Sequence, residues 1–169
     1  MSTSPRITLI TGANRGLGRN GALAVAKAGS DVIVTYRSHA DEAQAVVAQI
    51  QALGRRAAAL QFDVADAAAL PGFVEALRAQ LGQWQATQLH ALVNNAGTAL
   101  YAPIAETTPA QFEEMVAVHL RGPYFLTQAL LPLIADGGRI LNVSSGLARF
   151  ALPGSSALSL IHISEPTRP

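Results

Sequence analysis

The sequence contains no cysteine, which excludes disulfide bonds, thiolate zinc sites and a thiol nucleophile. An excess of charge of one sign is also missing, since 12 Lys and Arg residues stand against 11 Asp and Glu residues. A formal net charge of +1 provides no strong field for nucleic acid or an anionic membrane surface, so we expect neither as a partner. A chain without cysteine suits a reducing compartment, and we expect a cytoplasmic protein.

Long hydrophobic runs are absent as well. The opening stretch MSTSPRITLITGA holds an apolar run that is too short for the core of a signal peptide and far below the ~20 residues that span a bilayer. No segment repeats at a fixed period. The 169 residues, 50% of them hydrophobic, are enough for one α/β domain with a core of its own.

Apolar runs of strand length alternate with helical stretches, which is typical of a parallel sheet covered on both faces. The expected strands are 6–11, 31–36, 57–64, 89–95 and 137–145. The expected helices are 16–28, 39–54, 67–81 and 107–134. The last helix has a predicted capping box, with Thr108 at the N-cap, Pro109 at N1 and Gln111 at N3.

The turn after the first strand reads TGANRGLG. Gly12 can take a tight turn, Gly16 lets the backbone approach a pyrophosphate, and Gly18 lets the following helix pack closely. The N-terminus of that helix favours phosphate charge. The alternative is a glycine-rich turn without a ligand. We expect cofactor contacts from Gly12, Asn14, Arg15, Gly16, Leu17 and Gly18.

This turn resembles the TGxxxGxG motif of the single-domain branch of the short-chain dehydrogenase/reductase family. The resemblance runs from Arg6 to Ala157 and includes several motifs in the family's order. It implies a Rossmann-like three-layer α/β sandwich with parallel strand order 3-2-1-4-5. It also implies an oxidoreductase similar to 3-oxoacyl reductases, which transfers a hydride between a nicotinamide and a small ketone or secondary alcohol. Because members of the family are commonly oligomeric, the resemblance also implies that the untruncated protein is a homo-oligomer.

TYRS ends the second strand, where such folds meet the adenosine ribose. An acidic side chain there accepts a hydrogen bond from the 2′-hydroxyl of the ribose, whereas an arginine can donate two hydrogen bonds to a 2′-phosphate. Tyr36, Arg37 and Ser38 include no acid, so we expect contacts from Arg37 and Ser38 to NADP(H) rather than NAD(H). Arg15 is a candidate second cation. The alternative is that both arginines are ordinary solvated residues.

Two further motifs match the family's cofactor contacts. Asp63 and Val64 follow the third strand and correspond to the adenine contact, although an aspartate there also suits a turn or a helix cap. The motif NNAG resembles the one that steadies the central sheet and lets the backbone approach the cofactor, with expected contacts from Asn94, Ala96 and Gly97. The alternative is a plain turn.

Ser144 and Ser145 end the fifth strand, at the edge where ligands gather in open α/β sheets. By resemblance, Ser145 is the catalytic serine that hydrogen-bonds the substrate oxygen. In VHLRG, His119 stands where the family has the asparagine of its proton relay, so His119 is a second catalytic candidate. The alternative is a packing or surface histidine. The remaining histidines show no metal-ligand spacing, and we expect no metal.

The family takes its proton from a tyrosine followed four residues later by a lysine. Those positions hold Leu158 and His162, and YxxxK occurs nowhere in the chain. Leucine has no titratable proton, so we expect the chain to be inactive. A functional substitution is one alternative, and a non-catalytic dinucleotide-binding regulatory module is another. A sugar-nucleotide epimerase or dehydratase of the extended branch fits the motif spacing less well.

The final stretch resembles no protein element. From Leu158 to Arg168, LSLIHISEPTR is similar to the one-frame translation of a transposase-type sequencing adapter, and Pro169 can continue it. We therefore expect residues 158–169 to be an artefactual or disordered tail. Residues 1–157 are then the N-terminal part of a Rossmann-fold domain whose C-terminal strands are missing, and its uncovered apolar faces should favour association.

Overall fold

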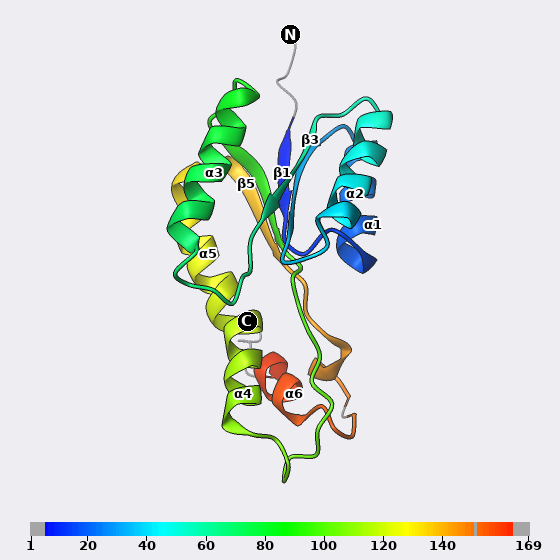
Figure 1. Ribbon diagram of the computed structural model, residues 1–169, viewed down its shortest axis with the longest axis vertical. Coiled ribbons are helices and arrows are strands. Elements are labelled where there is room, and N and C mark those ends of the chain that lie inside the picture. Colours follow the sequence, from blue (N-terminus) through cyan, green and yellow to red (C-terminus); the bar gives the residue numbers. More distant parts are fainter. Residues whose placement is uncertain (1–5, 151, 164–169) are drawn as a thin grey trace.

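The computed structural model describes residues 6–150 and 152–163. Five parallel strands form one sheet in the order β3-β2-β1-β4-β5, which confirms the predicted fold class and strand order (Figure 1). The strands are β1 (Ile7–Ile10), β2 (Asp31–Tyr36), β3 (Ala57–Gln61), β4 (Leu89–Asn94) and β5 (Ile134–Asn142). The chain moves outward from β1 to β3 and then returns to place β4 on the other side of β1. Ligands in such sheets bind beyond the carboxyl ends of the strands at this reversal.

Helices cover both faces of the sheet (Figure 1). On one face lie α1 (Gly16–Lys27) and α2 (Ala40–Ala52), and on the other lie α3 (Leu70–Gln83) and α5 (Gly122–Leu130). Successive strand residues alternate between these layers: Val32 and Val34 pack with α1 and α2, whereas Ile33 packs with α3 and α5. Small residues on α1, Ala22 and Ala26, let that helix lie close to the sheet.

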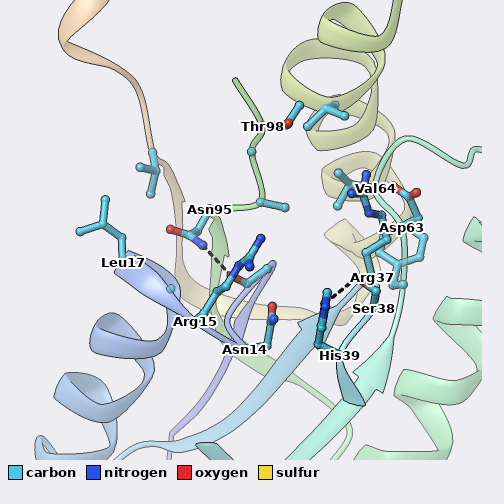
Figure 2. A pocket seen from close by; sticks show the side chains of 17 residues that line it. Asn14, Arg15, Leu17, Arg37, Ser38, His39, Asp63, Val64, Asn95 and Thr98 are labelled. Carbon is cyan, nitrogen blue, oxygen red and sulfur yellow. Dashed lines mark hydrogen bonds between the residues drawn. The ribbon is translucent and has the colours of Figure 1, made fainter. Parts of the chain in front are cut away.

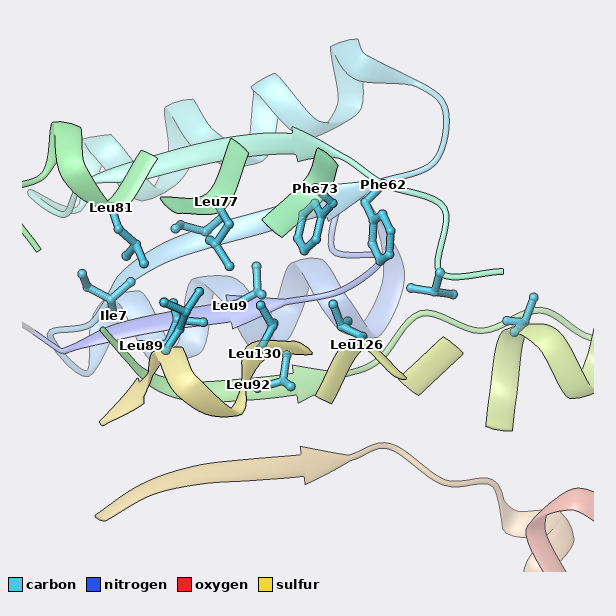
Figure 3. Packing of buried hydrophobic residues seen from close by; sticks show 14 residues of the cluster. Ile7, Leu9, Phe62, Phe73, Leu77, Leu81, Leu89, Leu92, Leu126 and Leu130 are labelled. Carbon is cyan, nitrogen blue, oxygen red and sulfur yellow. The ribbon is translucent and has the colours of Figure 1, made fainter. Parts of the chain in front are cut away.

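The larger core lies between the sheet, α3 and α5 (Figure 3). Leu77, Leu92 and Leu130 are fully buried there, and the rings of Phe62 and Phe73 stack with their centroids 4.2 Å apart. Burying one leucine side chain contributes about 1.5–3 kcal/mol relative to leaving it exposed. This core holds the strand ends that carry the predicted motifs in fixed positions.

The long helix expected over 107–134 is divided in the structure. It consists of α4 (Pro109–Val116), a π-helical turn (Ala117–Arg121), α5 and a 3-10 turn (Leu131–Leu133). Pro123 explains the break, because it has no N–H to donate to the carbonyl of His119 four residues earlier. The predicted capping box at the start of α4 is confirmed, with Thr108 and Gln111 bonding each other's backbone N–H.

The chain beyond β5 differs from expectation. β5 begins and ends three residues earlier than predicted, so Ser144 and Ser145 lie in the segment after the strand. A last helix, α6 (Ser156–Ile163), begins before the expected tail, and Ile161 packs with Met115 of α4. Residues 158–163 of the expected tail thus belong to α6, and residues 164–169 lie outside the described part of the chain.

Candidate functional site

A cavity of about 370 Å³ lies beyond the carboxyl ends of β1 to β4 (Figure 2). The turn after each strand contributes side chains or backbone to it. The lining residues are Gly12, Asn14, Arg15, Leu17 and Gly18 after β1, Arg37, Ser38 and His39 after β2, Phe62, Asp63 and Val64 after β3, and Asn95, Ala96, Gly97 and Thr98 after β4, with Val118 and Val143. Most of the residues predicted to bind a cofactor thus line one cavity.

The glycines of the first turn have geometry that other residues would not tolerate. Gly12 has a φ of +61°, and a Cβ there would lie 2.9 Å from the Cα of Ala96. At Gly18 a Cβ would lie 2.5 Å from the side chain of Asn95. Gly16 also has a positive φ, of +57°, but a Cβ there would meet nothing within 4 Å. The first turn is therefore packed against the NNAG loop at Gly12 and Gly18, and is open at Gly16.

The start of α1 leaves its backbone donors available. Arg15 is the N-cap residue, in an extended conformation, and its side chain makes no capping hydrogen bond. The first N–H groups of a helix have no partner within the helix, and together with the helix dipole they favour an anion. The space above Gly16 therefore fits the diphosphate of a dinucleotide, with the guanidinium of Arg15 beside it.

Thr11 and Asn95 hold the two central loops together. The hydroxyl of Thr11 accepts from the backbone N–H groups of Asn95 and Ala96, both at 2.9 Å. In return, Nδ2 of Asn95 donates to the carbonyls of Thr11 (2.9 Å) and Gly12 (3.2 Å). Asn95 was not among the predicted site residues, although its place in NNAG was the available signal. Its role in the structure is to fix the turn after β1 against the loop after β4.

The end of the cavity next to β2 is rich in cations. Arg37, Ser38 and His39 lie together in Figure 2, with the side chain of Arg15 facing them across the cavity. Oγ of Ser38 lies 2.9 Å from Nδ1 of His39. The carbonyl of Arg37 accepts from Nε2 of Gln61 at 3.0 Å, which anchors the strand end to β3. None of the three residues after Tyr36 is acidic, so this end of the cavity suits a phosphate.

Asp63 has a clear structural contact. Its Oδ1 accepts from the backbone N–H of Ala65 at 2.9 Å, which is the turn-forming role that the sequence left open. Asp63 and Val64 also line the cavity. A turn role and a contact with a ligand are therefore compatible at Asp63.

Gly16 and Asn94 are the two predicted cofactor residues that do not line this cavity. Gly16 is the first residue of α1 and stands between two lining residues. Asn94 is buried at the end of β4, where its Nδ2 donates to Oδ1 of Asn142 at 2.8 Å and to Oγ1 of Thr127 at 3.2 Å. Asn94 thus ties β4 to β5 and α5.

His119 lies in the π-helical turn and lines a second cavity, of about 440 Å³, together with Asn94 and His162. Its Nε2 lies 2.8 Å from the carbonyl oxygen of Thr98 and 3.3 Å from the backbone nitrogen of Thr98, so the ring tautomer decides whether it donates to the carbonyl or accepts from the N–H. A Cβ at Gly97 would lie 3.1 Å from the imidazole, so the glycine makes room for the ring. Burial lowers the pKa of His119; the hydrogen bond to Thr98 partly opposes this shift, and the charge of His162 adds to it.

The two serines have local partners. Oγ of Ser145 accepts from the backbone N–H of Leu147 at 3.2 Å and caps a 3-10 turn (Gly146–Ala148). Oγ of Ser144 lies 3.1 Å from Nδ1 of His162, whose ring centroid is 5.9 Å from that of His119. Ser145 lines neither of the two cavities. The structure therefore does not gather Ser145 and His119 around one space.

Within residues 6–150 and 152–163, no three His, Asp or Glu side chains are grouped so that they could hold a metal ion. The helices of the same described ranges include none that is long and apolar enough to cross a membrane.

The chain is similar to several known proteins. The family model for short chain dehydrogenases matches residues 6–159. An uncharacterized oxidoreductase of Methylorubrum extorquens is 37% identical over 154 residues, which are 91% of this chain and 60% of that protein. A hydroxynaphthalene reductase of Aspergillus fumigatus is 32% identical over 151 residues, covering 89% of this chain and 54% of the reductase.

The chain is also similar to solved structures of short-chain dehydrogenases and ketoreductases. The angucycline C-6 ketoreductase LanV with bound NADP aligns with a TM-score of 0.90 at 37% identity, over 94% of this chain and 62% of that chain. A putative short-chain alcohol dehydrogenase of Sinorhizobium meliloti aligns with a TM-score of 0.84 at 34% identity, over 95% of this chain and 62% of the dehydrogenase. The chain thus spans less than two thirds of the length of each of these relatives.

Proposed function

The chain belongs to the short chain dehydrogenase family, and from that premise we propose that it binds NADP(H) in the cavity beyond β1 to β4. The observation that carries the proposal is the pair of arginines, Arg15 and Arg37, on a cavity that no acidic residue lines from the end of β2. A ribose 2′-hydroxyl would call for an acidic acceptor there, whereas a 2′-phosphate calls for guanidinium groups. The NADP bound to LanV supports this choice of cofactor.

Each part of the cavity fits one part of the dinucleotide. The open start of α1, between the lining residues Arg15 and Leu17, and its first N–H groups would hold the diphosphate. Arg37 and Ser38 would hold the 2′-phosphate, with Arg15 as the second cation. Asp63 and Val64 would lie against the adenine, and Ala96 and Gly97 would let the backbone approach the ring at the other end.

When bound, the nicotinamide supplies a hydride to a ketone or takes one from a secondary alcohol. The names of the ketoreductase and the hydroxynaphthalene reductase support a small-molecule carbonyl substrate for the complete protein of this type. In this chain Ser145 would donate to the substrate oxygen. The alkoxide formed on reduction also needs a proton, and Leu158 has none to give. We therefore expect cofactor binding with negligible turnover.

The test is a calorimetric titration of the full chain with NADPH and with NADH. NADPH should bind about 10-fold or more tightly, because hydrogen bonds to charged groups contribute about 1.5–3 kcal/mol each. Arg37→Gln should bring the two affinities together while leaving NADH binding unchanged. Equal affinities in the wild-type chain, or an unchanged preference in Arg37→Gln, would contradict the proposed role of Arg37.

A non-catalytic dinucleotide-binding module is the second candidate, favoured by Leu158 and His162 at the positions of the family's tyrosine and lysine. The double variant Leu158→Tyr, His162→Lys separates the two. Residues four apart share a helix face, so the variant restores both groups on one side of α6. A reductase scaffold should then oxidise NADPH faster with a ketone present than without it. Binding with no gain in turnover would favour the non-catalytic module.

A further inference from the structure

We propose that the chain has a second binding site, at the opposite end of the sheet from the cavity proposed to bind NADP(H), and that this site takes a phosphate group, either free or on a small molecule. The site is a cavity of about 420 Å³ between the amino ends of β1 and β4, the end of α1 and the middle of β5. Its volume is within the range of about 300–1,000 Å³ that is common for small-molecule sites. Among the described residues, the two cavities have no lining residue in common.

Two arginines line this second cavity from different strands. Arg6 precedes β1, and Arg139 lies in β5. Within residues 6–150 and 152–163, every ion pair involves Asp31, which binds two other arginines. Arg6 and Arg139 therefore have no carboxylate partner in that part of the chain. Two guanidinium groups at one cavity favour an anion with several oxygens, and a phosphate can accept two hydrogen bonds from an arginine.

His90 adds a hydrogen-bond donor to the same cavity. The backbone N–H of Ile7 donates to Nδ1 of His90 at 3.1 Å, so Nδ1 has to be without a proton. In the neutral ring the proton is then on Nε2, and that N–H remains the donor for another partner. His90 lines the cavity and can therefore bind a phosphate oxygen without carrying a positive charge.

Carboxylates do not compete with an anion at this site. Among the described residues, no aspartate or glutamate lines the cavity. Asp31 follows the lining residue Ser30, but it is 1% exposed and both of its oxygens bind arginines. Asp136 precedes the lining residue Gly137 and does not itself line the cavity. A bound phosphate would therefore be the dominant negative charge for Arg139.

The C-terminus of α1 lies beside the cavity, and the carbonyls at such an end carry partial negative charge. Two of these carbonyls already accept hydrogen bonds. The carbonyl of Val25 accepts from the N–H of Ser30 at 3.0 Å, and that of Ala26 accepts from the N–H of Gly29 at 2.9 Å. Lys27, in the last turn of α1, offsets part of the remaining negative charge. The arginines therefore determine the sign of the charge at the cavity.

The experiment is a titration of the full chain with phenyl phosphate, followed by NMR of the backbone amides. The amide resonances of Gly29, Gly137 and Gly138, which line the cavity, should shift and saturate together. Arg139→Gln should weaken the binding measured at these resonances about 3- to 10-fold, because it removes a charge-assisted donor that is partly screened by solvent. Arg78→Gln removes an exposed arginine of α3 and is the matched control, which should bind as the wild type does.

Inorganic phosphate and phenol separate the two parts of the probe. Tighter binding of phenyl phosphate than of inorganic phosphate would assign the site to a phosphate monoester, and equal binding would assign it to the free anion. Phenol that shifts the same glycine resonances as strongly as phenyl phosphate would overturn the inference.

Two further results would overturn the inference: resonances of the three glycines that neither phosphate moves, or shifts that persist with the same affinity in Arg139→Gln and in Arg6→Gln. The wild-type titration needs no variant, so the test remains decisive if a variant does not fold. Phosphate bound only at the NADP(H) cavity would shift the amides after β1 and leave these three glycines unchanged. Failure here would therefore leave the proposed NADP(H) site untouched.

Discussion

At the scale of single residues, the cavity proposed to bind the cofactor depends on a few side chains with defined chemistry. Arg15 and Arg37 supply positive charge to the cavity. The glycines of the first turn have backbone conformations or close contacts that a residue with a larger side chain could not adopt without strain. These positions were predictable because each belongs to a local motif with a physical reason. His39 also lines the cavity, but no sequence motif marks its position.

His119 provides a prediction about stability and pH. Burial lowers its pKa in the folded chain below the ordinary value of 6.5, so the unfolded chain binds more protons in the interval below that pH. The stability that neutral His119 contributes is therefore complete above pH 6.5 and is lost as the pH falls. The difference in unfolding free energy between the wild type and His119→Asn, measured by urea denaturation, should decrease from pH 7.5 to pH 5.5. A difference that does not vary with pH would argue against a buried, neutral His119.

At the scale of elements, the order and type of strands and helices followed from the alternation of apolar runs with amphipathic segments. The exception is the helix of residues 109–130, where a π-helical turn interrupts the pattern at His119. The sequence contained Pro123, but helical periodicity alone does not separate a proline that is tolerated from one that shifts the hydrogen bonds. The early start of β5 was also missed: the apolar residues up to Ile134 continue the helical pattern and were predicted as helix, whereas Ile134 is the first residue of the strand.

The capping box of α4 can be tested as an element. Thr108→Ala removes the hydroxyl that accepts from the N–H of Gln111, and should destabilise the chain by about 0.5–2 kcal/mol. Thr108→Ser keeps the acceptor and serves as the matched control, with a much smaller expected loss. Denaturant melts of the three proteins measure the effect, and equal losses for alanine and serine would show that the hydroxyl does not cap the helix.

At the scale of the whole molecule, β5 is an edge strand with apolar side chains open to solvent. Ile140 is 42% exposed and Leu141 is 57% exposed. An exposed edge of this kind offers unpaired backbone groups and apolar surface to another chain. The predicted strand order already placed the fifth strand at an edge of the sheet, whereas the exposure of its individual side chains needed the structure.

The exposed edge predicts self-association. The wild-type chain should form larger species as its concentration rises, and Leu141→Lys should shift sedimentation toward the monomer because a charge on an edge opposes pairing. Leu53→Lys is the matched control, since Leu53 is also an exposed leucine, 41% accessible, but lies at the end of α2. A concentration-independent monomer, or equal effects of the two lysines, would contradict a role for β5.

The central claim is that the turns after β1 and β2 form a binding site for a phosphorylated dinucleotide. Hydrogen–deuterium exchange of the full chain, with and without NADP⁺, tests it most directly. We predict slower exchange in residues 11–19 and 36–40 when NADP⁺ is present, and unchanged exchange in α3. Exchange in both turns that stays the same at saturating NADP⁺ would contradict the claim.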